Sequence, residues 1–374
     1  MYDNSKLFVP RAELKMTVID GLVDYVNSDS LAVMQMYDPY VINVSEIYNH
    51  HNQVVVFLGP GEYHHDSWLD DIFCRSKNYH KQHGVLKNYY IMIHRHDYPE
   101  SIKQNYSDYF TLIKEPYLYS FYKDKIPLID PAILRNSIKH LHFLSLNNRV
   151  SDHRASLYYF FEKFSLREKS YFSYQGDLDR SPYQTHNDLS ALLVDGDAPW
   201  YLKNLDLTEL NSRIPVTIDT DPWNGNDWGQ GQNSFYTDTF CSIVTETYTE
   251  EVYPYFTEKV FKPLAYFHPF IISGNKNSLK FLQDMGYKTF SKYWDESYDK
   301  LQGNRRLEAM FHVILEIGNW SVDKINAVYQ DMLPILEHNH NHFYTTVPKI
   351  FNDNLPNMFA QIKQIVEDKQ RFLG

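Results

Sequence analysis

The stretch YFTEKVFKPLAYFHPFIISG, residues 255–274, predicts two elements of secondary structure in direct succession. Thr257 is a good N-cap residue, and the charged pair Glu258 and Lys259 behind it is typical of the first turn of a helix. The run then becomes apolar and ends in FIISG, closed by Gly274, as expected of a short buried strand. A helix that leads directly into a buried strand is typical of an α/β fold.

The same alternation recurs along the chain. Further buried strands are predicted in NQVVVFLGPGE (Asn52–Glu62), YYIMIHRHD (Tyr89–Asp97) and HLHFLSL (His140–Leu146). Two segments have apolar residues at helical spacing: RASLYYFFEKF, which starts at Arg154, and SLKFLQDMG (Ser278–Gly286), which stops at a glycine. Strands that alternate with helices indicate parallel sheets covered by helices on both faces.

Two such blocks predict two Rossmann-like domains. We expect an N-terminal domain over residues 1–130 and a C-terminal domain over 138–350, with the proline-containing segment 126–137 as the linker. Residues 351–374 are expected to form a helix that packs back on the N-terminal domain. A chain of 374 residues is long enough for two domains of ordinary size.

Composition excludes several classes of protein. The chain is 43% hydrophobic and 22% charged, which is typical of a globular protein. The 36 Lys and Arg against 47 Asp and Glu give a net charge of −11 without any run of basic residues. Because binding to a nucleic-acid backbone needs a basic surface, non-specific DNA or RNA binding is disfavoured.

Cysteine usage and hydropathy indicate the compartment. The only cysteines are Cys74 and Cys241, without a CxxC motif, so a disulfide framework is not expected. No signal peptide is recognisable at the N-terminus, and no segment has the roughly 20 apolar residues that span a bilayer. We therefore expect a cytoplasmic protein without a membrane span.

The predicted helix start at Thr257 has the chemistry of an anion site. The first N–H groups of a helix have no partner inside the helix, and together with the helix dipole they attract phosphate. Lys259 adds a mobile positive charge, and Glu258 offers two acceptors for a sugar diol. Taken alone, Thr-Glu-Lys is more often an ordinary cap with a solvated charge pair, because short motifs have high false-positive rates.

The neighbouring motifs resemble those of the α-1,3-fucosyltransferase-like glycosyltransferases, which have a GT-B fold of two Rossmann-like domains facing each other across a cleft. That family has F-x-x-x-x-E-N-S, a gap, and then Y-[VI]-T-E-K followed by a helix and a strand. This chain has FCSIVTET (Phe240–Thr247), then YFTEK (Tyr255–Lys259), then PFIISG. The segment Gly286–Asp299 and the EHNHNHF segment also resemble glycosyltransferases of phage genomes.

The resemblance implies a donor site for a nucleotide-diphosphate sugar. Arg154 and Lys259 would hold the diphosphate, Tyr255 would line the nucleotide pocket, and Glu246 and Glu258 would meet ribose or donor-sugar hydroxyls. The implied donor-binding set also contains three residues at strand and helix ends: Asn147, Arg149 and Thr257. Thr247 stands where the family has asparagine, which leaves the donor base and sugar open.

An acceptor side is implied in the N-terminal half. VVVFLGPGEY (Val54–Tyr63) matches the family's F-x-G-E-N, and Glu62 takes the place of its glutamate as the catalytic base. Three residues of the same loop are rival bases: His64, His65 and Asp66. Trp223 and Trp228, in a Gly- and Asn-rich loop, either stack on a sugar ring or anchor that loop to the surface.

No metal or cofactor is expected. The histidine-rich segments lack the i, i+4 spacing with a carboxylate, or the cysteine pair, of common zinc sites. The HNHNH segment (His338–His342) would place three imidazoles on one face if it were a strand, but a solvated turn is favoured. Asp219-Thr220-Asp221 spells the D-x-D motif of metal-dependent glycosyltransferases, which is a weak signal in an Asp-rich loop.

These observations predict a glycosyltransferase that moves a sugar from a nucleotide-diphosphate donor to an acceptor hydroxyl with inversion. The expected acceptor is a glycan or a lipid-linked saccharide. One alternative is a phage enzyme that adds a hexose, or a pentose such as arabinose, to a hydroxymethylated pyrimidine of DNA, which requires base flipping. Another is a non-catalytic module that binds a nucleotide sugar or a glycan without turnover.

Overall fold

The chain is an α/β protein with two parallel sheets. The computed structural model describes residues 31–35, 53–59, 66–94, 100–124, 126–147, 151–175, 200–203, 206–218, 233–247, 249, 254, 256–370 and 373. The chain divides into two compact units, Met1–Phe121 with Thr345–Gly374, and Tyr122–Tyr344. Within each unit, the α/β class predicted from alternating strands and helices is confirmed.

The first unit is built on a four-stranded parallel sheet with strands in sequence order. Its elements are β1 (Leu31–Gln35), β2 (Gln53–Gly59), α3 (Asp66–His83), β3 (Asn88–His94), α4 (Glu100–Tyr106), β4 (Phe110–Lys114), the 3-10 helix η2 (Pro116–Asp124), which runs across the boundary between the units, and α14 (Val347–Gln370). The three valines of β2 are fully buried, as the apolar run predicts.

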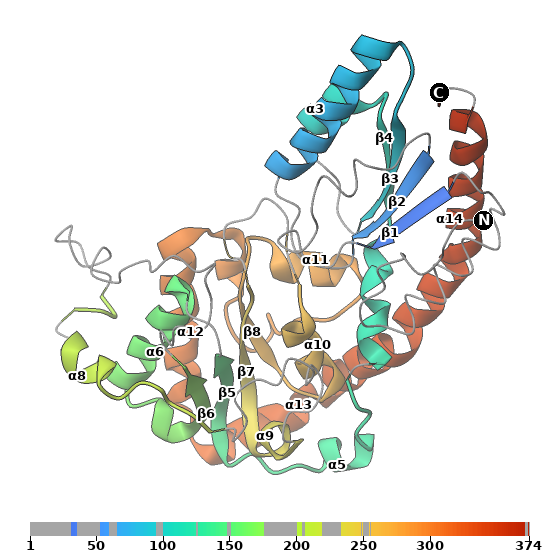
Figure 1. Ribbon diagram of the computed structural model, residues 1–374. Coiled ribbons are helices and arrows are strands. Elements are labelled where there is room, and N and C mark those ends of the chain that lie inside the picture. Colours follow the sequence, from blue (N-terminus) through green and yellow to red (C-terminus); the bar gives the residue numbers. More distant parts are fainter. Residues whose placement is uncertain are drawn as a thin grey trace. The chain divides into compact units, whose positions relative to one another are not determined.

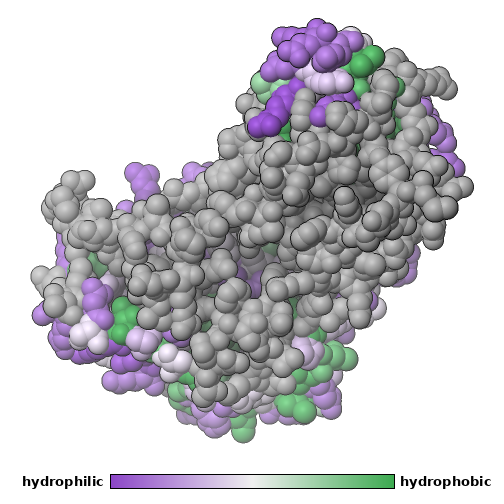
Figure 2. Space-filling view, viewed as in Figure 1, coloured by the Kyte–Doolittle hydropathy of each residue, from purple (hydrophilic) through white to green (hydrophobic). Residues whose placement is uncertain are grey.

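Helices cover both faces of this sheet. Right-handed crossovers place α3 and α4 on one face, where Phe73 of α3 stacks on Phe110 of β4 with ring centroids 4.6 Å apart. Helix α14 covers the other face (Figure 1) and adds Phe351, Met358 and Ile362 to the same hydrophobic core. The outward side of α3 is hydrophilic, as Figure 2 shows. The C-terminal helix is therefore part of the first unit's core.

The second unit contains the other parallel sheet, with strand order β6-β5-β7-β8. Its elements are α5 (Pro131–Arg135), β5 (Leu141–Asn147), α6 (Asp152–Lys163), η3 (Arg167–Lys169), β6 (Ser170–Tyr174), α8 (Leu207–Asn211), α9 (Asn233–Asp238), β7 (Thr239–Thr245), α10 (Glu258–Ala265), β8 (Phe270–Ser273), α11 (Ser278–Asp284), η4 (Ser297–Lys300), α12 (Gly303–Gly318), α13 (Val322–Asn341) and the π-helix η5 (His342–Thr346), which also crosses the boundary. The expected linker 126–137 lies inside this unit and holds α5.

The strand order creates a switch point between β5 and β7. From β5 the chain passes through α6 to β6 on one side, and from β7 it passes through α10 to β8 on the other. Right-handed crossovers in opposite directions put α6 and α10 on opposite faces of the sheet (Figure 1). The carboxyl ends of β5 and β7 therefore lie at a switch point of the kind where open α/β sheets bind ligands.

Helix α10 forms where Thr257 predicts its start, despite Pro263 in its second turn. Val260, Phe261 and Leu264 are buried on its inner side. Proline cannot donate to the preceding turn, and the helix ends two residues later at Ala265. The helix is therefore short, and its N-terminus lies at the carboxyl edge of the sheet.

The HNHNH segment is not the solvated turn that the sequence favoured, nor a strand. It spans the end of α13 and the first residue of η5, and each of its three imidazoles bonds a backbone carbonyl at the C-terminal end of another helix. His340 bonds the carbonyl of Ala265, and His342 that of Met285, both at 2.7 Å. The prediction was wrong because these helix-end carbonyls, which have no partner in their own helices, come from segments distant in sequence.

A buried lysine lies at the opposite, amino edge of this sheet. Lys139 Nζ donates to the carbonyls of Tyr236 and Thr237 at 2.9 and 3.1 Å and lies 4.1 Å from the centre of the Tyr329 ring. Burial lowers the pKa of Lys139 to about 7, although Asp238 partly opposes this shift.

This pKa predicts a pH-dependent free energy of unfolding. Between pH 7 and the ordinary lysine pKa the unfolded chain binds more protons at this position than the folded chain, so stability rises with pH. From pH 7 to pH 9 the wild type should gain about 2 kcal/mol relative to Lys139→Met. Urea unfolding of both proteins at several pH values measures this difference, and parallel pH profiles would contradict it.

Candidate functional site

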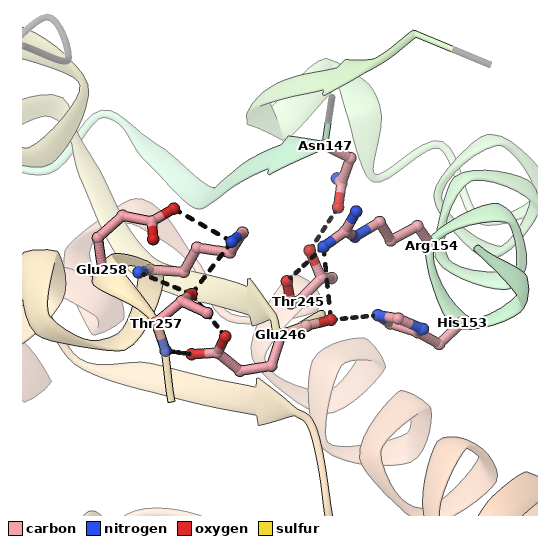
Figure 3. Close-up of polar contacts among 8 residues, drawn as sticks. Asn147, His153, Arg154, Thr245, Glu246, Thr257 and Glu258 are labelled. Carbon is pink, nitrogen blue, oxygen red and sulfur yellow. Dashed lines mark hydrogen bonds and ion pairs between the residues drawn. The ribbon is translucent and has the colours of Figure 1, made fainter. Parts of the chain in front are cut away.

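Polar and charged side chains gather at the carboxyl ends of β5 and β7. Asn147 ends β5, Thr245 ends β7, and Glu246 follows directly. The first turns of α6 and α10 reach the same place from opposite faces of the sheet, bringing Arg154 and Thr257 (Figure 3). The site is therefore built at the switch point, from segments more than 90 residues apart in sequence.

The Thr257 hydroxyl organises the α10 side of the site. It donates to Glu246 Oε2 at 2.7 Å and accepts from the backbone N–H of Lys259 at 3.4 Å and from Lys259 Nζ at 3.0 Å. One donated and two accepted bonds use the full capacity of a hydroxyl group. The predicted N-cap is confirmed, and it also fixes the lysine side chain.

Glu246 is turned inward rather than toward a ligand. Its Oε1 accepts the backbone N–H of Thr257 at 3.2 Å, while Oε2 accepts the hydroxyl (Figure 3). The residue is fully buried, and burial raises the pKa of its carboxyl group even though Lys259 and Thr257 act in the opposite direction. In this structure Glu246 ties the end of β7 to the start of α10, and both of its carboxyl oxygens are engaged.

Substitutions at Thr257 test this network. Thr257→Val should lower the free energy of unfolding by about 2–3 kcal/mol, because it removes the N-cap and a donor to a buried carboxylate. Thr257→Ser keeps the hydroxyl and should cost less than about 1 kcal/mol. Urea unfolding distinguishes the two variants. Equal losses would show that shape at this position matters and the hydroxyl does not.

Glu258 and Lys259 form the accessible part of the site. Lys259 Nζ lies 3.1 Å from Glu258 Oε1, and the two side chains are 31% and 19% exposed. Burial alone would raise the pKa of Glu258, but Lys259 and Lys262 outweigh it and the pKa is lowered. Glu258 is therefore ionised at neutral pH. Among the described residues, two of the three Lys259 ammonium protons are engaged, so one remains for a ligand.

On the α6 side, His153 and Arg154 hold the end of β7. Arg154 Nη2 donates to the carbonyls of Thr245 and Glu246 at 3.1 and 3.4 Å. His153 Nε2 donates to the carbonyl of Glu246 at 2.9 Å, and its Nδ1 lies 3.1 Å from the Ser151 hydroxyl. Both residues therefore position the backbone at the switch point.

His153 keeps its neutral form in this environment. Burial, together with the charge of Arg154, lowers its pKa to about 3. A neutral ring that donates through Nε2 must accept at Nδ1, so the Ser151 hydroxyl donates to it. The Ser151 side chain, at the N-cap of α6, accepts no bond from a backbone N–H in the first turn of its own helix. The α6 N-terminus thus lacks the capping bond that Thr257 supplies to α10.

Asn147, at the end of β5, is the last residue of the site to be placed by its hydrogen bonds. Its Oδ1 accepts the Thr245 hydroxyl at 2.7 Å, and its Nδ2 donates to Ser145 Oγ and to the carbonyl of Ser173 at 3.0 and 3.1 Å. The side chain therefore joins β5 to β7 and β6. Asn147 holds the strand ends in place at the site, and its side-chain bonds run within the sheet.

The structure brings together one part of the predicted donor set. Asn147, Arg154, Glu246, Thr257 and Glu258 lie in the described part of the chain and meet at the switch point (Figure 3). Lys259 is also described, and its Nζ bonds to Thr257 and Glu258 there. Other predicted residues lie outside the described residues: Glu62, His64, His65, Arg149, Asp219, Thr220, Asp221, Trp223, Trp228 and Tyr255. Asp66 is the first residue of α3.

His153 is a site residue that the sequence analysis missed. The available signal was SDHR, which begins after the four residues NNRV that follow a predicted strand, since a serine N-cap followed by polar residues marks a helix start near a strand end. What that pattern does not contain is the bond to the carbonyl of Glu246, 93 residues further along the chain.

Comparisons of the chain with protein-family models, curated proteins and solved structures find no match. No helix in the described part of the chain combines the length and apolarity needed to cross a membrane. Across the same residues, no group of three or more His, Cys, Asp and Glu side chains is arranged to hold a metal ion. The function is therefore inferred from the chemistry of the site.

That chemistry favours an anionic ligand. Arg154 and Lys259 bring two positive charges, and the N-terminal ends of α6 and α10 add their dipoles. Glu246 is engaged inside the protein, so the negative group nearest a ligand is Glu258, which is suited to accept bonds from hydroxyls. A molecule with both phosphate and hydroxyl groups matches this arrangement.

Proposed function

We propose that the protein is a glycosyltransferase that uses a nucleotide-diphosphate sugar as donor and transfers the sugar with inversion. The observation that carries the proposal is the convergence of Lys259, Arg154 and two helix N-termini on the switch point of the second unit. The GT-B class, in which two Rossmann-like units face each other across a cleft, belongs to this proposal, as do a cytoplasmic location and a phage origin.

The proposed chemistry needs the charges that the site holds. When the bond between the anomeric carbon and the diphosphate breaks, negative charge grows on the leaving group. Fixed cations and helix N–H groups therefore stabilise the transition state more than the ground state. Lys259 reaches the ligand directly, whereas Arg154 acts through the backbone carbonyls that it holds and through its charge. No metal is required for this step.

The acceptor side is assigned to the first unit. Its sheet is parallel, so the carboxyl ends of β2, β3 and β4 lie at one edge, where such sheets bind ligands. Glu62, the base implied by the resemblance, comes three residues after the end of β2 in the sequence. A glycan or lipid-linked saccharide fits the acidic chain better than duplex DNA does.

A panel of nucleotide sugars tests the proposal. UDP-, GDP-, dTDP- and CMP-sugars are added separately, and thermal unfolding is followed, because a ligand that binds only the folded chain raises its apparent stability. We expect one base and sugar to stabilise the protein and to be hydrolysed slowly without an acceptor. Stabilisation without hydrolysis or transfer would favour a binding module instead. No stabilisation by any member would contradict the proposal.

A second panel, of possible acceptors, tests which molecule receives the sugar. With the stabilising donor present, transfer is measured to a set of glycans and to duplex DNA that contains hydroxymethylcytosine. Transfer to DNA, with binding that weakens steeply as salt is added, would identify the DNA-modifying alternative. Transfer to a glycan, with a rate that does not depend on the salt concentration, would identify the saccharide acceptor.

A further inference from the structure

The chain passes between the two units twice, from Phe121 to Tyr122 and from Tyr344 to Thr345. The first crossing lies within η2 and the second within η5. On the second unit's side, residues at both crossings pack on α10, the helix whose N-terminus belongs to the candidate donor site. The second unit therefore holds the donor helix and both of its own chain connections in one place.

Phe261, in the middle of α10, makes the contact with both crossings. Its ring stacks on that of Tyr122, with centroids 5.0 Å apart and planes 24° apart, and on that of Phe343, at 5.9 Å and 21°. All three side chains are buried. Aromatic rings at such distances attract each other beyond the area that they bury. Because the interior is close-packed, Phe261 cannot shift without moving both neighbouring rings or leaving a void.

Further bonds join the two crossings to each other and to the end of α10. The Tyr344 hydroxyl shares its proton between the carbonyls of Ile126 and Pro127, both at 3.2 Å. His340, near the end of α13, bonds the carbonyl of Ala265, the last residue of α10, at 2.7 Å. The crossings and α10 therefore form one packed cluster inside the second unit.

The anion site and Phe261 lie close together along this helix. Phe261 follows the N-cap Thr257 by about one helical turn. A diphosphate that bonds Lys259 and the first-turn N–H groups would oppose fraying of that turn. Because Phe261 belongs to the end of the same turn, a ligand that holds the turn also holds the ring.

We propose that α10 couples the anion site at its N-terminus to the two crossings between the units, with Phe261 as the coupling residue. A bound diphosphate then restricts local opening of both crossings. By reciprocity, whatever orders the crossings strengthens diphosphate binding. The proposal rests on the proposed function for the identity of the ligand, and it adds a conformational effect to donor binding.

Amide hydrogen exchange of the full-length chain, followed by mass spectrometry, tests the coupling. The ligand is inorganic pyrophosphate, which carries the diphosphate charge without a base or a sugar. Exchange is followed in peptides that contain Lys259, Tyr122 or Phe343. Peptides of α12 are the internal reference, since that helix packs on α6 through the stacked rings of Phe311 and Phe160.

In the wild type, pyrophosphate should slow exchange at Lys259 and, by about fivefold or more, at both crossings. Exchange in α12 should stay unchanged. Without ligand, Thr257→Val loosens the first turn and should speed exchange at both crossings relative to α12. Thr257→Ser keeps the cap and should leave exchange at the crossings near that of the wild type.

Three substitutions test the route. Phe261→Leu keeps an apolar side chain and removes both stacks, so it should keep the protection at Lys259 and lose it at both crossings. Phe343→Leu removes one stack and should lose more protection at the second crossing than at the first. The matched control is Phe270→Leu in β8, which is equally buried and contacts the Phe290 ring at 5.1 Å. This control should transmit protection as the wild type does.

Protection at Lys259 that does not reach the crossings, or that reaches them equally in Phe261→Leu, would overturn the coupling and leave the proposed function standing. If pyrophosphate protects nothing in α10, the proposed function loses its anion site, and the effect of the ligand on the crossings is overturned as well. Thr257→Val then decides the coupling itself. Faster exchange at both crossings relative to α12 supports it, and unchanged exchange overturns it.

Discussion

Replacing Lys259 with methionine is expected to lower the rate of sugar transfer by about 10²–10³-fold, which is the usual cost of removing one preorganised donor from a developing negative charge. Methionine keeps most of the length of the side chain and removes the ammonium group. That group lies at the start of α10, 3.0 Å from the Thr257 hydroxyl and 3.1 Å from Glu258. The stabilisation that the donor gives in thermal unfolding should fall in parallel.

The control is Lys262→Met, which removes the same charge from the same helix one turn further on. It lies in the last turn of α10, away from the helix N-terminus, so its effect on rate should stay within about tenfold. Initial rates with saturating donor measure both variants. If Lys259→Met and Lys262→Met lose activity equally, net charge alone sets the rate and the proposed diphosphate contact is wrong.

Asp299→Ala is expected to lower the free energy of unfolding by about 3–5 kcal/mol, because it leaves the charge of Arg306 buried and uncompensated. Both side chains are buried, with Arg306 Nη2 3.2 Å from Asp299 Oδ1. The same carboxylate accepts the backbone N–H groups of Leu279 and Lys280 at 3.0 and 3.1 Å and so caps α11. One substitution therefore removes an ion pair and a helix cap.

Asp295→Ala is the matched control in the same segment. Asp295 accepts the backbone N–H and the hydroxyl of Ser297, both at 2.8 Å, but these bonds are exposed to solvent. Its loss should cost about 1 kcal/mol or less. Urea unfolding measures the two variants side by side, and a loss at Asp299 no larger than that at Asp295 would mean that the buried pair contributes little.

The local parts of the fold could be predicted from the sequence. Strand β8 and the start of α10 were predicted because an apolar β-branched run and a threonine cap act over a few neighbouring residues. The parallel sheets followed from the alternation of such segments. In contrast, the strand order that places β5 beside β7 depends on which apolar faces pack together, and no local pattern contains it.

In the site, too, local features could be predicted from the sequence and contacts between distant segments could not. That Thr257 caps a helix was predictable, but the direction of the Glu246 side chain was not. The resemblance implied that Glu246 meets ligand hydroxyls, whereas its carboxylate in this structure is bonded to Thr257. Its role depends on the distance between β7 and α10, which the fold sets.

A crystal structure with the nucleoside diphosphate of the stabilising donor tests the central claim most directly. We predict that its phosphate oxygens lie within hydrogen-bond distance of Lys259 Nζ and of the first-turn N–H groups of α10, at the switch point between β5 and β7. A nucleotide bound elsewhere, with its phosphates away from that helix end, would contradict the account.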